Sequence, residues 1–203
     1  LALRSSRIYK ANRVSTDESS RLETFHDGWQ ELFDEVQPAL THIWNNDETG
    51  TVHTHNSQKV IAEKGQKTIG VKRSNPSENV TVVATINAAN AKMPLLFIYK
   101  GQRVQAAWVC NRSPASLWYV ATDSSFMEGP VYLNFMKKFK EFIDNSGLND
   151  SKPHVLVLDG RASHVVIDVL KYTMEHDIHL FQLPPHFSHI SQPLDVCAFG
   201  LFK

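Results

Sequence analysis

Residues 154–160 read HVLVLDG, and residues 183–200 read LPPHFSHISQPLDVCAFG. The first motif is an apolar run that ends on Asp159, and the second places Asp195 in a Gln-Pro-Leu-Asp turn before another apolar patch. A buried strand that presents a carboxylate at its carboxyl end is a common way to bring charge to a site. We expect the rest of the chain to support these two acids and to supply a third.

Between the two motifs the chain carries one helix pattern and one strand pattern. Apolar residues recur at helical spacing over residues 163–175, and residues 178–183 read as a strand that Pro184 ends. A right-handed crossover of this kind places the second strand beside the first and returns the chain to the same end of the sheet. The spacing therefore favours Asp159 and Asp195 lying near one another.

The residues before this region predict a mixed sheet with helices on its faces. An amphipathic pattern over residues 15–36 predicts a core helix, and two β-branched runs joined by small residues predict an antiparallel hairpin. Residues 102–125 are expected to be irregular. The expected elements are helix 15–36, strand 40–47 closed by a turn at 47–50, strands 80–87 and 94–101, helix 127–144, strand 155–158, helix 163–175, strand 178–183 and a final helix near residue 195. The fold class is α/β (an α+β mixed sheet), with three antiparallel strands followed by alternating helices and strands.

Composition sets broad limits on the kind of protein. At 203 residues with a formal net charge of zero, the chain fits one domain, and nothing in its totals demands a polyanionic partner. Its 2 cysteines have no metal-like spacing and are typical of a reducing compartment. No apolar run reaches the roughly 18 residues that a membrane span needs, so no membrane partner is expected.

Three acids stand out because of where they fall in this pattern. Asp47 closes the first predicted strand, Asp159 closes the fourth, and Asp195 begins the last helix. Carboxylates brought together repel one another and stay ionised only around a divalent cation, and oxygen ligands select Mg²⁺ or Mn²⁺. Two such ions, about 3.5–4 Å apart, activate an attacking oxygen and stabilise the leaving oxygen of a phosphodiester. The structural alternative for each acid is a helix cap or turn residue bonded to its own backbone.

Four motifs together extend this interpretation: NNDETG (45–50), NVTVVATINAANAKMPLLFIYKG (79–101), VLVLDGRASH (155–164) and LPPHFSHISQPLDVCAFGLFK (183–203). They resemble the catalytic domain of the pogo/Tigger/jerky-type DDE transposases of the Tc1/mariner superfamily. The last motif is the most specific of the four, and the resemblance covers nearly the whole chain.

The resemblance implies an RNase H-like (retroviral integrase-like) fold and Mg²⁺- or Mn²⁺-dependent cutting and joining of DNA with two ions. It assigns Asp47, Asp159 and Asp195 as catalytic residues and metal ligands, a DDD triad. It implies transposon ends and target DNA as partners, a homo-oligomer on DNA, and a nuclear location. It divides the chain into residues 1–14, a basic linker or the end of an upstream region, and residues 15–203, the DDE catalytic domain, truncated at both ends relative to the full protein.

Five further residues are candidates for the surroundings of the acids or for DNA contact. Arg161 stands where the family pattern has His or Asn, and its charge either steadies a phosphate or competes with metal for the neighbouring acid. Glu48 adjoins the first acid but faces the other side of a strand. The set is Glu48, Arg161, His164, His189 and Gln192. A basic stretch over residues 59–73 is either a phosphate track or a solvated loop.

The sequence therefore predicts a metal-dependent DNA endonuclease and strand-transfer domain of a pogo/Tigger-like transposase. The alternative from another class is a domesticated, transposase-derived DNA-binding or chromatin protein that keeps the fold without nuclease activity. A cellular nuclease of the RNase H type fits the three acids but not the wording of the last motif.

Overall fold

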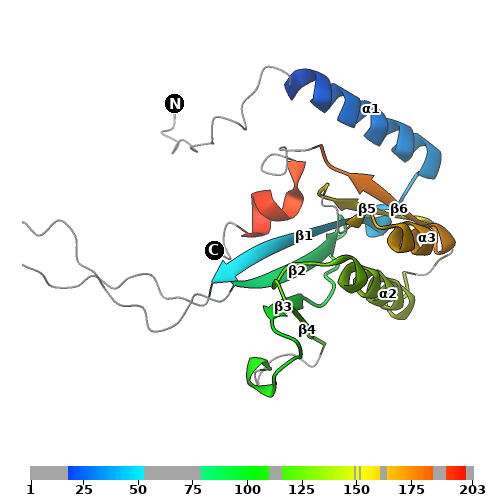
Figure 1. Ribbon diagram of the computed structural model, residues 1–203. Coiled ribbons are helices and arrows are strands. Elements are labelled where there is room, and N and C mark those ends of the chain that lie inside the picture. Colours follow the sequence, from blue (N-terminus) through cyan, green and yellow to red (C-terminus); the bar gives the residue numbers. More distant parts are fainter. Residues whose placement is uncertain are drawn as a thin grey trace, which may run out of the picture. The chain divides into compact units, whose positions relative to one another are not determined.

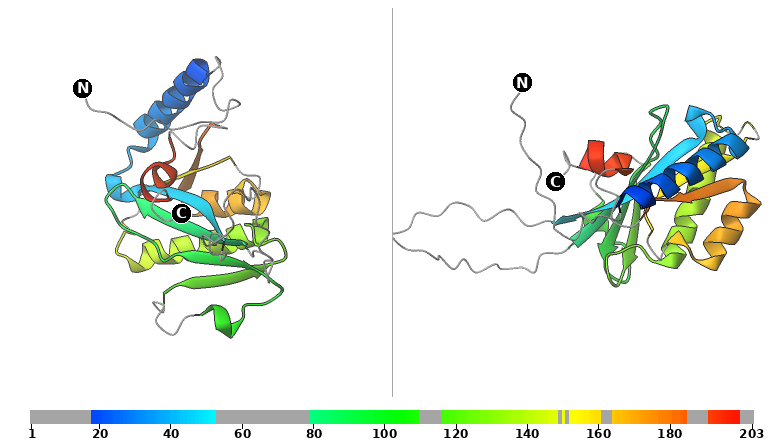
Figure 2. Two further views of the ribbon diagram at one scale, coloured as in Figure 1. Left: turned by 90° about the vertical axis from the view of Figure 1, so that its left-hand side faces the viewer. Right: turned by 90° about the horizontal axis from the view of Figure 1, so that it is seen from above.

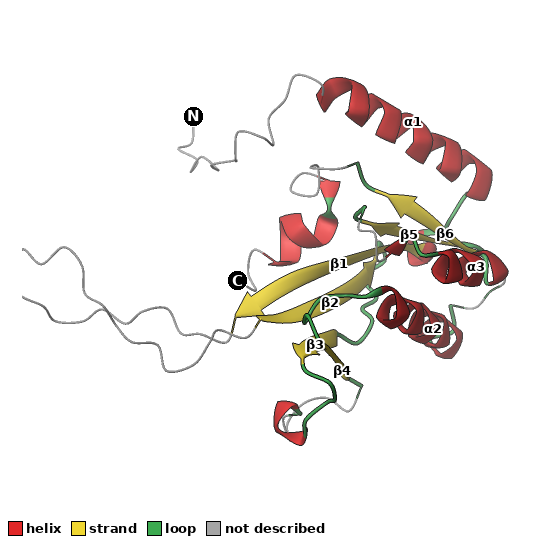
Figure 3. Cartoon of the chain, viewed as in Figure 1, coloured by secondary structure: helices red, strands yellow, loops and turns green. Residues whose placement is uncertain are grey.

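The computed structural model describes residues 18–52, 79–109, 116–148, 150, 152–160, 164–184 and 191–199 (Figures 1 and 3). Its helices and strands are α1 (Glu18–Val36), β1 (Ile43–Val52), β2 (Asn79–Asn87), β3 (Leu96–Lys100), β4 (Trp118–Thr122), α2 (Gly129–Asn145), β5 (His154–Leu158), α3 (Ile167–Glu175) and β6 (Ile178–Gln182). Short 3₁₀ turns occur at Leu40–His42 and Ala106–Trp108, and a single π-helical turn spans Leu194–Ala198.

The strands form one hydrogen-bonded order, β4-β3-β2-β1-β5-β6. The pair β2/β3 is antiparallel, as the hairpin pattern predicted, whereas β1/β5, β5/β6 and β3/β4 are parallel. The sheet is therefore mixed, and the predicted fold class is confirmed.

By compactness the chain divides into two units, which are described separately. The first unit comprises residues 1–47, 84–94 and 128–203, and the second comprises residues 48–83 and 95–127. The first unit holds the start of β1, the end of β2, β5, β6 and the three helices. The second unit holds the remaining parts of β1 and β2 together with β3 and β4.

In the first unit, helices cover both faces of β1, β5 and β6 (Figure 2). Because strand side chains alternate, Trp44 points to one face and its neighbour Asn45 to the other. On the Trp44 face, the indole meets Phe139 of α2 edge-on at 5.3 Å between ring centroids, and both side chains are fully buried. On the opposite face, Trp29 of α1 meets Phe181 of β6 at 4.9 Å. The α2 side is thus the better-packed half of the core.

The helix α1 is less buried than its pattern predicted. Its apolar stripe was expected to make it a core helix, but none of its described side chains is buried, and Phe33 is 38% exposed. Phe25 and Trp29 provide its ring contacts with the strands, both to Phe181. The periodicity correctly predicted a helix with an apolar face, but it could not show how much of that face would be covered.

In the second unit, β4 occupies part of the region predicted to be irregular. That prediction was wrong, because Trp118–Thr122 pairs residue by residue with Leu96–Lys100 of β3. The segment reads WYVAT, and aromatic and β-branched residues suit a strand once a partner is present. Tyr99 stacks on Trp108 at 4.5 Å, which holds the following 3₁₀ turn against β3.

Two predicted boundaries also need correction. The turn predicted at residues 47–50 lies inside β1, which continues to Val52, so Asp47 is an interior strand residue. The helix predicted from Ser163 begins at Ile167, and Val166, in extended conformation, precedes it. Residues 161–163 lie outside the described part of the chain, as does the basic stretch 59–73.

Candidate active site

The strands β1 and β5 bring the first two acids to one level of the sheet. These parallel strands pair Ile43 with Val155 and Asn45 with Val157. Continuing this register by two residues on each strand sets Asp47 opposite Asp159, which directly follows β5. Adjacent strands in a sheet lie about 4.8 Å apart, so the two carboxylates start from neighbouring backbone positions.

The third acid is brought to β1 by hydrogen bonds from the residues around it. The buried Gln192 side chain donates through Nε2 to the carbonyl oxygen of Asn46 at 3.0 Å. The backbone N–H of Leu194 donates to Asn45 Oδ1 at 3.1 Å. Asp195 is the next residue along the chain, so the first residue of the π-helical turn is hydrogen-bonded to β1. The Gln-Pro-Leu-Asp motif is therefore attached to β1, two residues before Asp47 at Asn45 and one residue before it at Asn46.

The three carboxylates differ in their exposure to solvent. Asp47 is 4% exposed, whereas the Asp159 side chain is 21% exposed and Asp195 is also partly exposed. Asp47 lies inside β1, whereas Asp159 directly follows β5 and Asp195 lies in the π-helical turn. This arrangement leaves two of the three carboxylates accessible to a solute.

His164 contacts the second acid directly. Its Nδ1 lies 3.2 Å from Asp159 Oδ1 and 3.3 Å from the Asp159 carbonyl oxygen. The imidazole is 1% exposed and packs against the Tyr132 ring of α2 at 4.2 Å. His164 thus bonds both to the backbone and to the carboxylate of Asp159.

Of the other four candidate residues, the structure describes two. Glu48 is 7% exposed, so a solvated position for it is excluded, and strand alternation directs its side chain away from the face of Asp47. Gln192 is fully buried and binds β1. Arg161 and His189 lie outside the described residues, so their predicted roles stay predictions.

Sequence reasoning missed Asn45. Its Nδ2 donates to the carbonyl oxygen of Val157 at 3.2 Å, and its Oδ1 accepts from Leu194. The available signal was the pair Asn45-Asn46 between Trp44 and Asp47. Asparagine is depleted in strands, so two asparagines in a buried strand indicate that their amides have specific partners.

The donor set fits Mg²⁺ or Mn²⁺ in chemistry, because three carboxylates supply the hard oxygen ligands that these ions prefer. Asp47 and Asp159 each lie two residues beyond the last pair of β1 and β5, and the turn that carries Asp195 is bonded to β1. Within the described ranges, however, no three His, Cys, Asp or Glu side chains are close enough together to hold a metal ion. The backbone positions suit a metal site, although the side chains are not gathered into one here.

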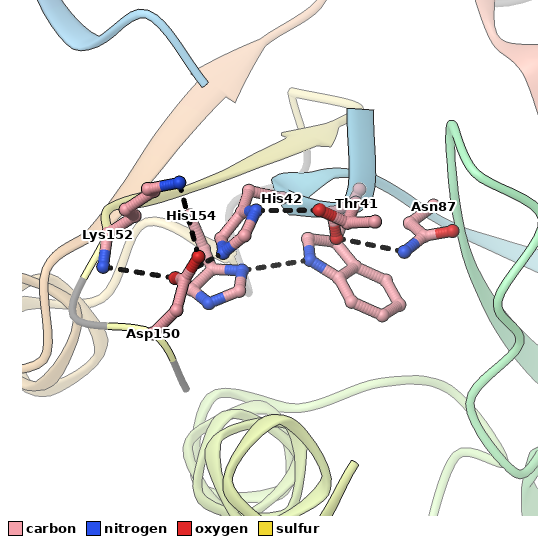
Figure 4. A network of polar contacts seen from close by, with 7 residues as sticks. Thr41, His42, Asn87, Asp150, Lys152 and His154 are labelled. Atoms are coloured by element: carbon pink, nitrogen blue, oxygen red, sulfur yellow. Dashed lines mark hydrogen bonds and ion pairs between the residues drawn. The ribbon is translucent and has the colours of Figure 1, made fainter. Parts of the chain in front are cut away.

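A polar network occupies the opposite, amino-terminal ends of β1 and β5 (Figure 4). Trp44 Nε1 donates to His154 Nδ1 at 3.1 Å, and the His154 ring lies 4.3 Å from the ring of His42. His42 Nε2 lies 2.8 Å from Asp150 Oδ1, and its Nδ1 lies 2.9 Å from Thr41 Oγ1. Burial, reinforced by the neighbouring imidazole, lowers the pKa of His154 to about 4. This network stabilises the end of the sheet remote from the acids.

Comparison with solved structures identifies the fold. The Mos1 mariner paired end complex with Mn is similar with a TM-score of 0.65 at 9% identity, over 99% of this chain and 52% of that chain. The catalytic domain of Mos1 mariner transposase is similar with a TM-score of 0.56 at 9% identity, over 93% of this chain and 71% of that chain. The predicted RNase H-like fold is thereby confirmed, since the chain shares the fold of these Mos1 structures.

The family follows from the sequence. Residues 77–203, more than half of the chain, match the family described as DDE superfamily endonuclease. The chain therefore belongs to the DDE superfamily endonucleases.

A further relative is named as a transporter. The MFS-type transporter clz9 of Cochliobolus lunatus is 25% identical over 146 residues, which cover 70% of this chain and 16% of that protein. The matched segment is thus a small fraction of the relative. Over the ranges that the structure describes, this chain has no helix of the length and apolarity that a membrane span requires.

Proposed function

We propose that this chain is the metal-dependent DNA cutting and joining domain of a pogo/Tigger-like transposase. In this proposal Asp47, Asp159 and Asp195 form a DDD triad that binds two Mg²⁺ or Mn²⁺ ions. The observation that carries the proposal is the arrangement around β1. Asp47 and Asp159 each lie two residues beyond the paired residues Asn45 and Val157, and the bonds from Gln192 and Leu194 attach the segment of Asp195 to the same strand.

The metal ions would activate the attacking oxygen and stabilise the leaving oxygen of the phosphodiester. The residues of the chain have the task of placing the three carboxylates. Asp47 is fixed by its strand, whereas Asp159 is oriented by the Nδ1 atom of His164. In cutting, water attacks phosphorus and a 3′-hydroxyl leaves. In joining, that 3′-hydroxyl attacks a phosphodiester of the target DNA, and the 3′-hydroxyl of the target strand leaves.

The proposed partners are transposon ends and target DNA, bound by more than one copy of the chain in the nucleus. Support comes from the fold similarity to Mos1 proteins, which include a paired-end complex with the left transposon end. Structures of the Mos1 catalytic domain with Mg and with Mn support the choice of ion. The formal net charge is zero, so DNA contact would depend on local patches.

The test is cleavage of transposon ends by the full-length protein with Mn²⁺ or Mg²⁺. Asp47→Ala, Asp159→Ala and Asp195→Ala should each reduce cleavage to background while DNA binding persists. Asp177→Asn is the matched control, because Asp177 is an exposed acid in a turn with a φ of 55°, a conformation that Asn tolerates. Wild-type protein that binds DNA but never cuts it, with either ion, would support the domesticated DNA-binding alternative instead.

A further inference from the structure

We infer that Asn45 is a positioning residue that holds the three acid-bearing segments in their relative places. This inference rests on the proposed function, because it assigns Asn45 a role in the same site. It does not make Asn45 a ligand or a catalytic residue. Its side chain acts through the backbone of the segments that carry Asp47, Asp159 and Asp195.

Both ends of the Asn45 amide are engaged, each by a different segment. Nδ2 donates to the carbonyl oxygen of Val157 at 3.2 Å, and Oδ1 accepts from the backbone N–H of Leu194 at 3.1 Å. The side chain is 6% exposed, so water competes little with either bond. An amide side chain offers a donor and an acceptor on one short, planar group.

The positions of these partners in the sequence give the bonds their significance. Asn45 lies two residues before Asp47 on the same strand face, because side chains alternate along a strand. Its acceptor, Val157, lies two residues before Asp159, and its donor, Leu194, directly precedes Asp195. One amide thus links the three backbone segments just before their acids. Losing the amide would loosen the turn that carries Asp195 relative to the strands that lead to Asp47 and Asp159.

Gln192 strengthens the same attachment. Its Nε2 bonds to the carbonyl oxygen of Asn46, so the 192–194 segment is fixed to two consecutive residues of β1. Two anchor points restrict both the sliding and the rotation of the turn along the strand. The Gln192 side chain is fully buried, so removing its partner would leave a buried polar group without its hydrogen bond.

A second buried asparagine shows what a purely structural role looks like. Asn87 is 5% exposed and also bonds to backbone on both sides of its amide. Its Nδ2 donates to the Thr41 carbonyl oxygen, while its Oδ1 accepts from the N–H groups of Ala89 and Ala91. These contacts close the turn after β2 and lead to none of the three acids. Asn87 is therefore a matched control for Asn45.

The experiment measures Mn²⁺ affinity by calorimetry on full-length wild type, Asn45→Ala and Asn87→Ala. We expect both variants to lose thermal stability, but only Asn45→Ala to bind Mn²⁺ more weakly, by about 10- to 100-fold. Equal Mn²⁺ affinity in wild type and Asn45→Ala would overturn the inference while leaving the proposed function intact. Absence of Mn²⁺ binding by wild type would instead contradict the proposed function.

A second variant tests the same inference if Asn45→Ala does not fold. Gln192→Met keeps the length of the side chain but removes the Nε2 donor to β1. Like Asn45→Ala, it should weaken Mn²⁺ binding. A folded Gln192→Met protein with wild-type Mn²⁺ affinity would show that attachment of the 192–194 segment to β1 does not support metal binding, which would overturn the inference.

Discussion

At the scale of single residues, His164 connects Asp159 to the core of the first unit. The imidazole packs on Tyr132 at 4.2 Å, and its Nδ1 contacts the carboxylate at 3.2 Å. Groups that orient ligands in this way typically change metal affinity or activity by about 10- to 100-fold when they are lost. His164 therefore combines a packing role with an orienting role, and one substitution can separate them.

His164→Phe retains an aromatic ring against Tyr132 but removes Nδ1. We expect DNA cleavage to fall by about 10- to 100-fold while the free energy of unfolding changes by about 1 kcal/mol. The control is His176→Phe, because His176 also stacks on a tyrosine, Tyr172, at 4.1 Å and bonds to the carbonyl oxygen of that residue. Cleavage at the wild-type rate by His164→Phe would show that Asp159 needs no such support.

At the scale of elements, β1 is the strand on which the site is built. Its residues from Trp44 to Thr49 are all buried, and it pairs with β5 on one side and neighbours β2 on the other. The sequence suggested a turn at residues 47–50 because Gly50 gives the backbone the freedom to reverse direction. Strand pairing determines the outcome here, since a central strand satisfies its backbone groups through its neighbours and continues through residues of low strand propensity.

Other elements show where a single sequence is informative. The hairpin of β2 and β3, the helix α2 and the strands β5 and β6 carry strong apolar periodicity, and all were predicted. The strand β4 was missed because its pairing with β3 involves a distant segment, which no local pattern reveals. The acids Asp159 and Asp195 could be proposed from their motifs, whereas Asn45 could not, because its role depends on Val157 and Leu194 arriving from elsewhere in the chain.

The packing of α2 on β1 gives an element-scale prediction. Phe139→Ala should lower the free energy of unfolding by about 3–5 kcal/mol, because it empties a fully buried site against Trp44. Phe33→Ala on α1, at 38% exposure, should cost less than about 1 kcal/mol. Denaturant titration of both variants measures this difference. Equal losses would mean that α1 is as firmly packed as α2.

At the scale of the whole molecule, all three acids belong to the first of the two compact units. The polar network around His42 and His154 belongs to the same unit, at the amino-terminal ends of β1 and β5. The ends of the strands thus differ in character, with the three acids at one end and a histidine network that includes Asp150 at the other. The stability of the molecule should therefore depend on pH through the histidine end.

His154 sets the direction of that dependence. Its pKa falls from 6.5 to about 4 in the folded chain, so protons bind the unfolded state first as pH decreases. The stability contributed by neutral His154 is fully present above pH 6.5 and is lost between pH 6.5 and about 4, a loss of about 3 kcal/mol. His154→Gln, which keeps an acceptor for Trp44, should flatten this part of the stability profile. Identical profiles in wild type and variant would contradict the assignment.

The central claim is that Asp47, Asp159 and Asp195 form one divalent-metal site. The most direct measurement is the number of Mn²⁺ ions bound per chain, determined by calorimetry with the full-length protein. We predict two ions for wild type and for Asp177→Asn, and a loss of Mn²⁺ binding in each of the three acid-to-alanine variants. Wild-type protein that binds no Mn²⁺, or acid variants that bind as many ions as wild type, would contradict the account.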